Sequence, residues 1–285
     1  MLDVQPLLTQ AEFRNHVIGY VTDLALRDFW YKEFLPLPAH IKSESISPIV
    51  NKTGLLMTHP LIRNIFGQSK SSLDFGNIMD TQKIFIANLS KGHLGEVGTQ
   101  FLGSMLLTQF QTASLARARQ PEAARTPFYL YIDEMHSFMT LSFADILAES
   151  RKYGLCLFLT HQYTDQLEEN IRTAILGNVG TLICFRIGTN DADILENEFY
   201  PVFTKTDLIA LPQYSIYLKL LIDGTTSQPF SAVTLPITAQ KHGLKEEIIA
   251  WSRKTYCLNK DTVNKSIQSR ISPDTIGAPQ NTLFS

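Results

Sequence analysis

Polar residues that follow two apolar runs have the side chains that chemistry on a phosphate requires. Asp133 and Glu134 come directly after the run 128–132, and Gln162 closely follows the run 155–159. An aspartate there can hold Mg²⁺, directly or through water, and a following glutamate can orient a water for attack on a phosphate. An amide such as Gln162 could sense the phosphate or orient the same water. These residues are candidates for phosphoryl-transfer chemistry.

Each candidate also has a plainer explanation. The acidic pair is equally well a solvated turn after a buried strand, because short motifs often mislead. Gln162 alone is better explained as an ordinary polar strand end. Arg151 lies between the two runs, and its fixed fork of donors could neutralise a transferring phosphoryl group, although a cation also suits a helix C-terminus. Arg172 and Arg186 are further basic candidates, but exposed arginines need no special explanation.

Strands that alternate with helices are expected to position these residues. The apolar runs that favour strands are 83–89, 128–132, 155–159 and 181–185. The helical patterns between them are 94–118, 143–152 and 165–176. Such spacing predicts parallel βαβ units in an α/β sheet with helices on both faces. Ligands bind at the carboxyl ends of the strands in such sheets, where Asp133, Glu134 and Gln162 all lie.

The remaining sequence divides the chain into four predicted parts. Residues 1–78 form a helical segment, with helices over 11–34, 46–57 and 60–66. Residues 79–240 hold the alternating pattern, and end in a hairpin of 215–221 and 230–235 with a turn at Asp223–Gly224. A terminal helix is expected within 241–257. The polar stretch 258–285 is predicted to be a disordered tail.

Composition narrows the class of protein. A hydrophobic fraction of 44% and a charged fraction of 18% are typical of a soluble globular protein. The 25 basic and 27 acidic residues are nearly balanced, so any contact with DNA must be local. No apolar run approaches the roughly 18 residues that span a bilayer, and the N-terminus lacks a signal-peptide pattern. Cys156, Cys184 and Cys257 have no metal-ligand spacing and are expected to be reduced, as in a cytoplasmic protein.

Residues 83–230 resemble the later half of the motor domain of HerA/FtsK-type ATPases, and most closely the TraG/TraD-like coupling proteins of type IV secretion. The stretches that carry the resemblance are Ile86–Gly95, Phe128–His136, Glu149–Leu155, Phe158–Gln162 and Asn178–Gly188. The helical stretch before residue 75 resembles the end of the all-α domain that is inserted in coupling proteins.

The resemblance implies a RecA-like fold in a hexameric ring that moves DNA by hydrolysing ATP with Mg²⁺. Asp133 and Glu134 match the Walker B site, with Asp133 holding Mg²⁺ through water and Glu134 organising the attacking water. Gln162 matches the sensor glutamine, and Arg151 a proposed arginine finger that reaches into the neighbouring subunit. The implied partners are DNA, a relaxase and type IV secretion channel proteins. The implied location is the cytoplasm at the inner face of the bacterial inner membrane, reached through partners or an N-terminal anchor.

One motif that this activity needs does not occur in the sequence. A phosphate-binding loop requires G-x-x-x-x-G-K-[ST], and the segment 67–71 lacks that spacing and a preceding strand. The isolated chain is therefore expected not to hydrolyse ATP. In the family, the strand that precedes this loop lies between the strands equivalent to 155–159 and 181–185. Without it, those two strands would have to pair directly or keep unpaired edges.

Two explanations stay open for this gap. In the first, Met1 is an internal start or follows a broken reading frame, with the missing half upstream. In the second, the chain is a degenerate product that folds poorly or borrows the strand from a partner. Two alternative functions also stay open. One is a non-catalytic assembly or regulatory partner of an intact motor, and the other is a HerA-like DNA-processing translocase.

Overall fold

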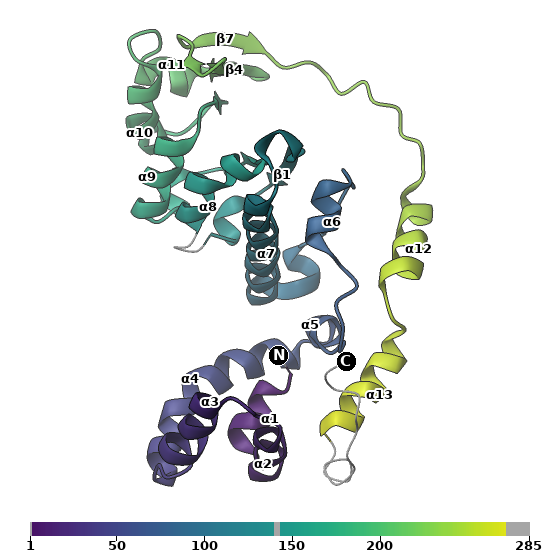
Figure 1. The fold of residues 1–285 in the computed structure, drawn as a ribbon. Helices are drawn as coiled ribbons and strands as arrows, with labels where there is room; N and C mark the ends of the chain where they lie inside the picture. The colour runs from purple at the N-terminus through teal and green to yellow at the C-terminus, as the bar shows by residue number, and fades with distance from the viewer. Residues whose placement is uncertain (1, 140–142, 272–285) are drawn as a thin grey trace. The chain divides into compact units, whose positions relative to one another are not determined.

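The computed structural model describes residues 2–139 and 143–271, which form two compact units (Figure 1). The first unit combines Met1–Leu73, Leu89–Gly98 and Gly243–Ser285, and the second combines Asp74–Asn88 and Thr99–His242. Both units therefore take segments from distant parts of the sequence. No helix among the described residues has the length and apolar character needed to cross a bilayer.

The first unit is helical, and it combines more of the sequence than the single segment 1–78 that the sequence predicts. Its N-terminal elements are α1 (Val4–Thr9), α2 (Ala11–Gly19), α3 (Leu24–Asp28), the π-helical turn Phe29–Phe34, α4 (Ala39–Thr58) and α5 (Pro60–Phe66). The single helix predicted over 11–34 is instead broken before Asp23. That aspartate caps α3, because its side chain accepts a hydrogen bond of 2.9 Å from Leu26 N.

The prediction of a disordered tail from residue 258 is wrong for its first part. After α12 (Lys245–Tyr256), the structure contains α13 (Lys260–Ile271). Val263 and Ile267 of α13 are buried together with Leu2, which explains why this polar sequence is ordered. The rest of the predicted tail, residues 272–285, lies outside the described residues.

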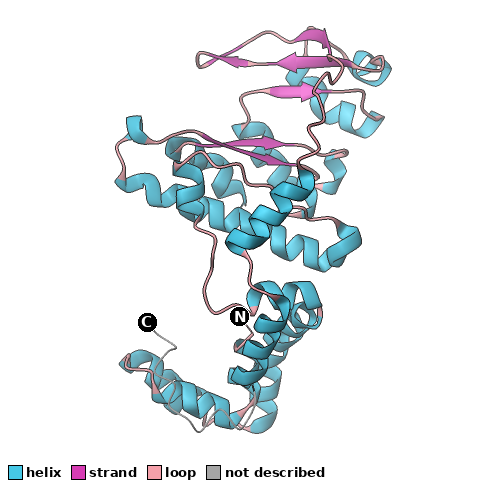
Figure 2. Ribbon diagram, turned by 90° about the vertical axis from the view of Figure 1, so that its right-hand side faces the viewer, coloured by secondary structure: helices cyan, strands magenta, loops and turns pink. Residues whose placement is uncertain are grey.

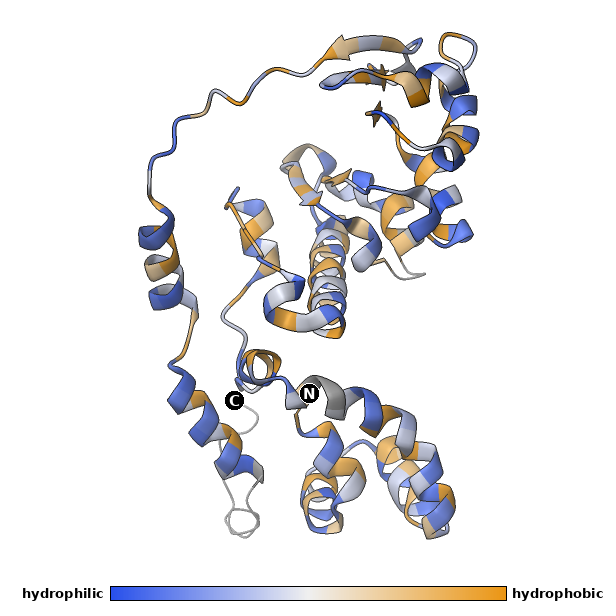
Figure 3. Cartoon of the chain, turned by 180° about the vertical axis from the view of Figure 1, so that it is seen from behind, coloured by the Kyte–Doolittle hydropathy of each residue, from blue (hydrophilic) through white to orange (hydrophobic). Residues whose placement is uncertain are grey.

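Two parallel strands form the part of the second unit that carries the acidic pair (Figure 2). β1 (Phe128–Ile132) and β2 (Leu155–Leu159) pair in register over their whole length, and their bounds are those that the sequence predicts. α8 (Phe143–Glu149) and a 3₁₀ turn over Ser150–Tyr153 connect them. α7 (Lys91–Ala116), which begins in the first unit, contributes buried apolar residues to the second, and hydrophobic residues recur along it in Figure 3.

A separate antiparallel sheet follows. β3 (Leu182–Cys184) pairs with β4 (Ser215–Lys219), which pairs with β7 (Phe230–Val233). The predicted hairpin is confirmed. Its tip is the small ladder of β5 (Leu221–Ile222) and β6 (Thr225–Thr226), which turns through the left-handed residues Asp223 and Gly224.

Helices pack on this second sheet. They are α9 (Glu169–Asn178), α10 (Thr189–Phe199) and α11 (Lys205–Ala210). Their shared core contains Cys184, Ala192, Phe199 and Leu208, each at most 4% exposed. The structure is thus mixed α/β, as predicted, but the described residues do not place β3 in the parallel sheet of β1 and β2. Among the described residues β3 pairs antiparallel with β4, so a RecA-like fold is not confirmed.

The strand predicted over 83–89 is also absent from the described structure. This segment lies as a loop between α6 (Phe75–Asp80) and α7. Ile84 and Ile86 are 91% and 82% exposed, while the ring of Phe85 packs 5.6 Å from that of Phe110. The segment has the apolar run that predicted a strand, but it is anchored through an aromatic contact and not through a neighbouring strand.

Candidate functional site

The carboxyl ends of β1 and β2 meet at one edge of the parallel sheet, and the backbone holds them together beyond the strands. Thr160 N donates to Ile132 O, and Met135 N donates to Thr160 O, each over 3.0 Å. The residues that follow the two strands are therefore neighbours, which brings Asp133, Glu134 and Gln162 together.

Both carboxylate oxygens of Glu134 face polar side chains. Gln162 Nε2 donates to Glu134 Oε1 over 2.5 Å. His136 Nδ1 lies 3.4 Å from Glu134 Oε2, and its imidazole is 17% exposed on the side chain. The sequence indicated the first contact through the positions of the strand ends. It gave no sign of the second, because His136 turns back through a 3₁₀ turn to face Glu134.

The Asp133 carboxylate is oriented by two donors on one oxygen. Thr160 Oγ1 donates to Asp133 Oδ1 over 2.5 Å, and Glu134 N donates to the same oxygen over 3.1 Å. Asp133 is exposed, so its carboxylate can reach a ligand. Sequence reasoning missed Thr160, although its position between the strand 155–159 and Gln162 was a usable signal.

The backbone of Glu134 is left-handed, with φ 51° and ψ 47°. This conformation costs about 1–2 kcal/mol for a residue with a Cβ atom. Met135, which is fully buried, follows Glu134 and fixes the turn. Strain of this kind, where packing enforces it, is common at functional sites and supports a role for Glu134 beyond that of a solvated turn.

The two adjacent carboxylates fit a magnesium ion that is shared with a phosphate, and not a metal site built from protein alone. In the described part of the chain no group of three or more His, Cys, Asp or Glu side chains could hold a metal ion. Mg²⁺ is commonly bound through one or two carboxylates, several waters and substrate phosphates. Asp133 and Glu134 are suited to that arrangement.

Arg151 lies at the opposite end of the strands. It belongs to the 3₁₀ turn that precedes β2, whereas Glu134 and Gln162 follow the strands. Because β1 and β2 are parallel, a whole strand length separates Arg151 from the carboxylates of its own chain. Arg151 is exposed, so it can contact another molecule.

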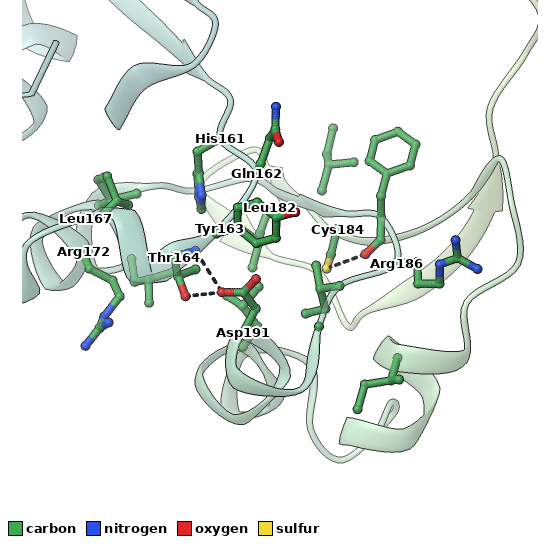
Figure 4. Close-up of a pocket in the computed structure, with 18 residues that line it drawn as sticks. His161, Gln162, Tyr163, Thr164, Leu167, Arg172, Leu182, Cys184, Arg186 and Asp191 are labelled. Atoms are coloured by element: carbon green, nitrogen blue, oxygen red, sulfur yellow. Dashed lines mark hydrogen bonds between the residues drawn. The ribbon is translucent and has the colours of Figure 1, made fainter. Parts of the chain in front are cut away.

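A cavity of about 710 Å³ adjoins the site and reaches from the loop after β2 to β3 (Figure 4). Gln162 is part of its lining, as are Arg172 and Arg186, which Figure 4 draws on opposite sides of the cavity. Its apolar walls come mainly from α9 and β3. In the described chain β2 pairs with β1 alone, and β3 with β4 alone, so each strand has an edge without a partner strand.

A buried aspartate fixes the floor of this cavity. Asp191 is 4% exposed and lies in the first turn of α10, where a carboxylate is favourable. Its Oδ1 accepts hydrogen bonds from Thr164 N over 2.9 Å and from Thr164 Oγ1. Asp191 is not among the residues predicted from the sequence, although a helix start after Gly188 was a usable signal.

Burial also determines the ionisation of two lining residues. Burial lowers the pKa of His161, and smaller effects, among them the nearby backbone of Tyr163 and the charge of Asp191, partly oppose this. Burial, assisted by the charge of Asp191, raises the pKa of Cys184 to about 11. Cys184 is therefore a neutral thiol in the core and not a reactive thiolate.

Comparison with known families supports the resemblance predicted from the sequence. Residues 127–197 match the family described as the TraM recognition site of TraD and TraG. No curated protein matches the chain. The matched segment runs from β1 into α10 and contains Asp133, Glu134, Arg151, Gln162 and Asp191. The match supports a TraG/TraD-like coupling protein, and with it a connection to type IV secretion and conjugation.

Proposed function

We propose that this chain is the part of a conjugative coupling protein that supplies the water-organising and magnesium-facing side chains of an ATPase site. The observation that carries this proposal is the hydrogen bond from Gln162 to Glu134 across the ends of two parallel strands. It lies within the segment that matches the TraG and TraD family. A solvated acidic turn would need neither the amide partner nor the left-handed backbone of Glu134.

The roles of the side chains follow from their positions. ATP bound with Mg²⁺ would supply the phosphoryl group that is transferred to water. Asp133, oriented by Thr160, would hold the ion through water. Glu134 would orient the attacking water and accept its proton, and Gln162 would connect that carboxylate with the γ-phosphate.

This activity needs a phosphate-binding loop from outside the 285 residues. The unpaired edges of β2 and β3, with the cavity that reaches from the loop after β2 to β3, support insertion of a further strand at this place. The apolar side chains of this inserted strand would cover Leu182 and Leu176, and the phosphate-binding loop after the strand would lie beside Gln162. We propose that the complete assembly is a hexamer that moves DNA and cooperates with a relaxase and channel proteins of type IV secretion.

The name of the matched family suggests a further partner. TraM is the protein whose recognition site in TraD and TraG gives the family its description. We propose that a TraM-like protein binds the segment 127–197 of this chain. A purified chain that fails to bind such a protein would remove this partner from the proposal without affecting the nucleotide site.

A second candidate function is that of a regulatory partner without ATPase activity of its own. The observation that favours it is the exposed Arg151 on the turn before β2. This chain would then donate Arg151 to the nucleotide site of an intact motor. Stimulation of an intact homologue that disappears on Arg151→Ala would support this function.

Complementation tests the main proposal. The P-loop half of a TraG/TraD-type ATPase is co-expressed with this chain, and ATP hydrolysis is measured for each part alone and for the complex. The proposal expects hydrolysis by the complex and none by the chain alone. A stable complex that binds ATP but does not hydrolyse it would contradict the proposal.

A further inference from the structure

The turn that carries Arg151 has an unusually constrained backbone. It ends at Gly154, whose φ of 72° favours glycine, and Gly154 N donates to Arg151 O over 3.1 Å. Gly154 O accepts from Phe128 N over 2.7 Å, so the turn is joined to the start of β1. The guanidinium of Arg151 makes no hydrogen bond or ion pair within the described residues, and the residue lies exposed.

Arg125 holds the residue that follows Arg151. Its Nη1 donates to Lys152 O over 2.6 Å, and its guanidinium lies 5.4 Å from the ring centre of Tyr153. The other donors of Arg125 bind the 3₁₀ turn after α7 and the residue that follows this turn, through Arg117 O at 3.1 Å and Gln120 O at 2.9 Å. One guanidinium thus joins the turn to a separate segment.

Arg117 binds the same turn and also contacts Arg125. It is 2% exposed, and its Nη1 donates to both Thr126 O and Tyr153 O over 3.0 Å. Its charge is balanced by Asp80, whose Oδ1 lies 2.8 Å from Nε. A Cβ atom at Gly154 would lie 3.2 Å from Arg117 Nη1, so glycine suits this position for lack of space as well as for its φ.

We propose that Arg125, supported by Arg117, is a positioning residue that fixes the direction in which Arg151 is presented to an anion on a neighbouring molecule. This inference rests on the proposed function, in which Arg151 acts on another subunit. Arg125 binds backbone carbonyls, and within the described part of the chain no ion pair competes for the charge of Arg151. A guanidinium on a fixed turn loses less conformational entropy when it binds, because its backbone is already ordered.

The thiol of Cys156, the second residue of β2, can report the position of Arg151. Burial raises the pKa of Cys156, and the charge of Arg151 opposes that rise. The rate of alkylation of Cys156 by iodoacetamide, followed by mass spectrometry as a function of pH, therefore senses the guanidinium. Mass spectrometry separates Cys156 from the exposed Cys257. The full chain is used alone, without nucleotide or partner.

A double-mutant cycle separates positioning from a simple change in burial. The apparent pKa of Cys156 is compared in the native chain, Arg125→Ala, Arg151→Ala and the double variant. Arg151→Ala should raise this pKa because it removes a stabilising charge. Arg125→Ala should change the apparent pKa of Cys156 by one amount when Arg151 is present and by a different amount when Arg151 is replaced by alanine. Arg119→Ala, which removes a nearby exposed cation, is the matched control and should leave the pKa unchanged.

The outcomes distinguish this inference from the proposed function. An equal effect of Arg125→Ala in both backgrounds would show that Arg125 does not position Arg151, and would overturn the inference. It would leave the proposed function intact, since the assay involves no ATP. If Arg125→Ala strongly lowers the melting temperature, Arg125→Lys replaces it in the double-mutant cycle. It keeps the charge, loses the forked donors and should show the same dependence on Arg151.

Discussion

The side-chain amide of Gln162 donates a 2.5 Å hydrogen bond to Glu134 Oε1 and so joins the ends of β1 and β2. Neither residue is deeply buried, which leaves both within reach of a ligand. A pair arranged in this way can pass a change at one strand end to the other. Its contribution to the fold should accordingly be small, and its contribution to chemistry large.

Replacing Gln162 by alanine should destabilise the chain by no more than about 1 kcal/mol, because the hydrogen bond is exposed to solvent. Urea unfolding of Gln162→Ala measures this change. Gln166→Ala, an exposed glutamine in the following turn, is the control and should be close to neutral. A loss of several kcal/mol at Gln162 would mean that the amide is a structural residue.

Replacing Asp191 by alanine should cost about 2–3 kcal/mol, because it leaves the buried N–H and hydroxyl of Thr164 without their acceptor. The control is Asp193→Ala in the same helix. Asp193 pairs with Lys205 on the surface, and such pairs contribute about 0–1 kcal/mol. Equal effects of the two substitutions in denaturant unfolding would contradict this account of Asp191.

Replacing Arg117 by alanine should cost about 2–3 kcal/mol, because it removes a buried guanidinium that pairs with the partly exposed Asp80 and donates to two carbonyls. Thermal unfolding would show the loss as a large decrease in melting temperature. Arg119→Ala, two residues along the chain and exposed, should change the melting temperature little.

Stability should depend on the protonation of His161. Burial lowers its pKa in the folded chain, so the unfolded chain binds more protons between the folded pKa and the ordinary value of about 6.5. The free energy of unfolding should therefore fall as the pH decreases below about 6.5 and level off below the folded pKa. His161→Gln should remove this part of the pH dependence, as measured by urea unfolding between pH 5 and 8. An identical pH profile for the variant would contradict the assignment.

The bounds of β1 and β2 could be predicted because each is a continuous apolar run with polar residues at its end. The start of α5 could be predicted from Pro60. The positions of Asp133, Glu134 and Gln162 followed from these bounds. Other features depend on contacts that no local pattern contains. The run 83–89 has the composition of a strand but packs through Phe85, and α13 is ordered because Leu2 lies against it.

The same limit applies to the site. β3 was predicted in the right place, but its antiparallel partner β4 comes more than thirty residues later in the sequence. Asp191 and Thr164 meet through the fold and have no shared motif. Arg117 lies within the predicted helix 94–118, whereas the contacts of its buried side chain with Asp80 and Tyr153 depend on segments about 36 residues away in either direction.

The most direct test of the central claim is ATP hydrolysis by the complex of this chain with a P-loop half, compared for native Glu134 and Glu134→Gln. The variant keeps the size of the side chain and removes its negative charge. We expect hydrolysis to fall at least about 100-fold, as for the loss of a general base, while ATP binding stays unchanged. Undiminished hydrolysis by Glu134→Gln would contradict the assignment of Glu134 as the residue that organises the attacking water.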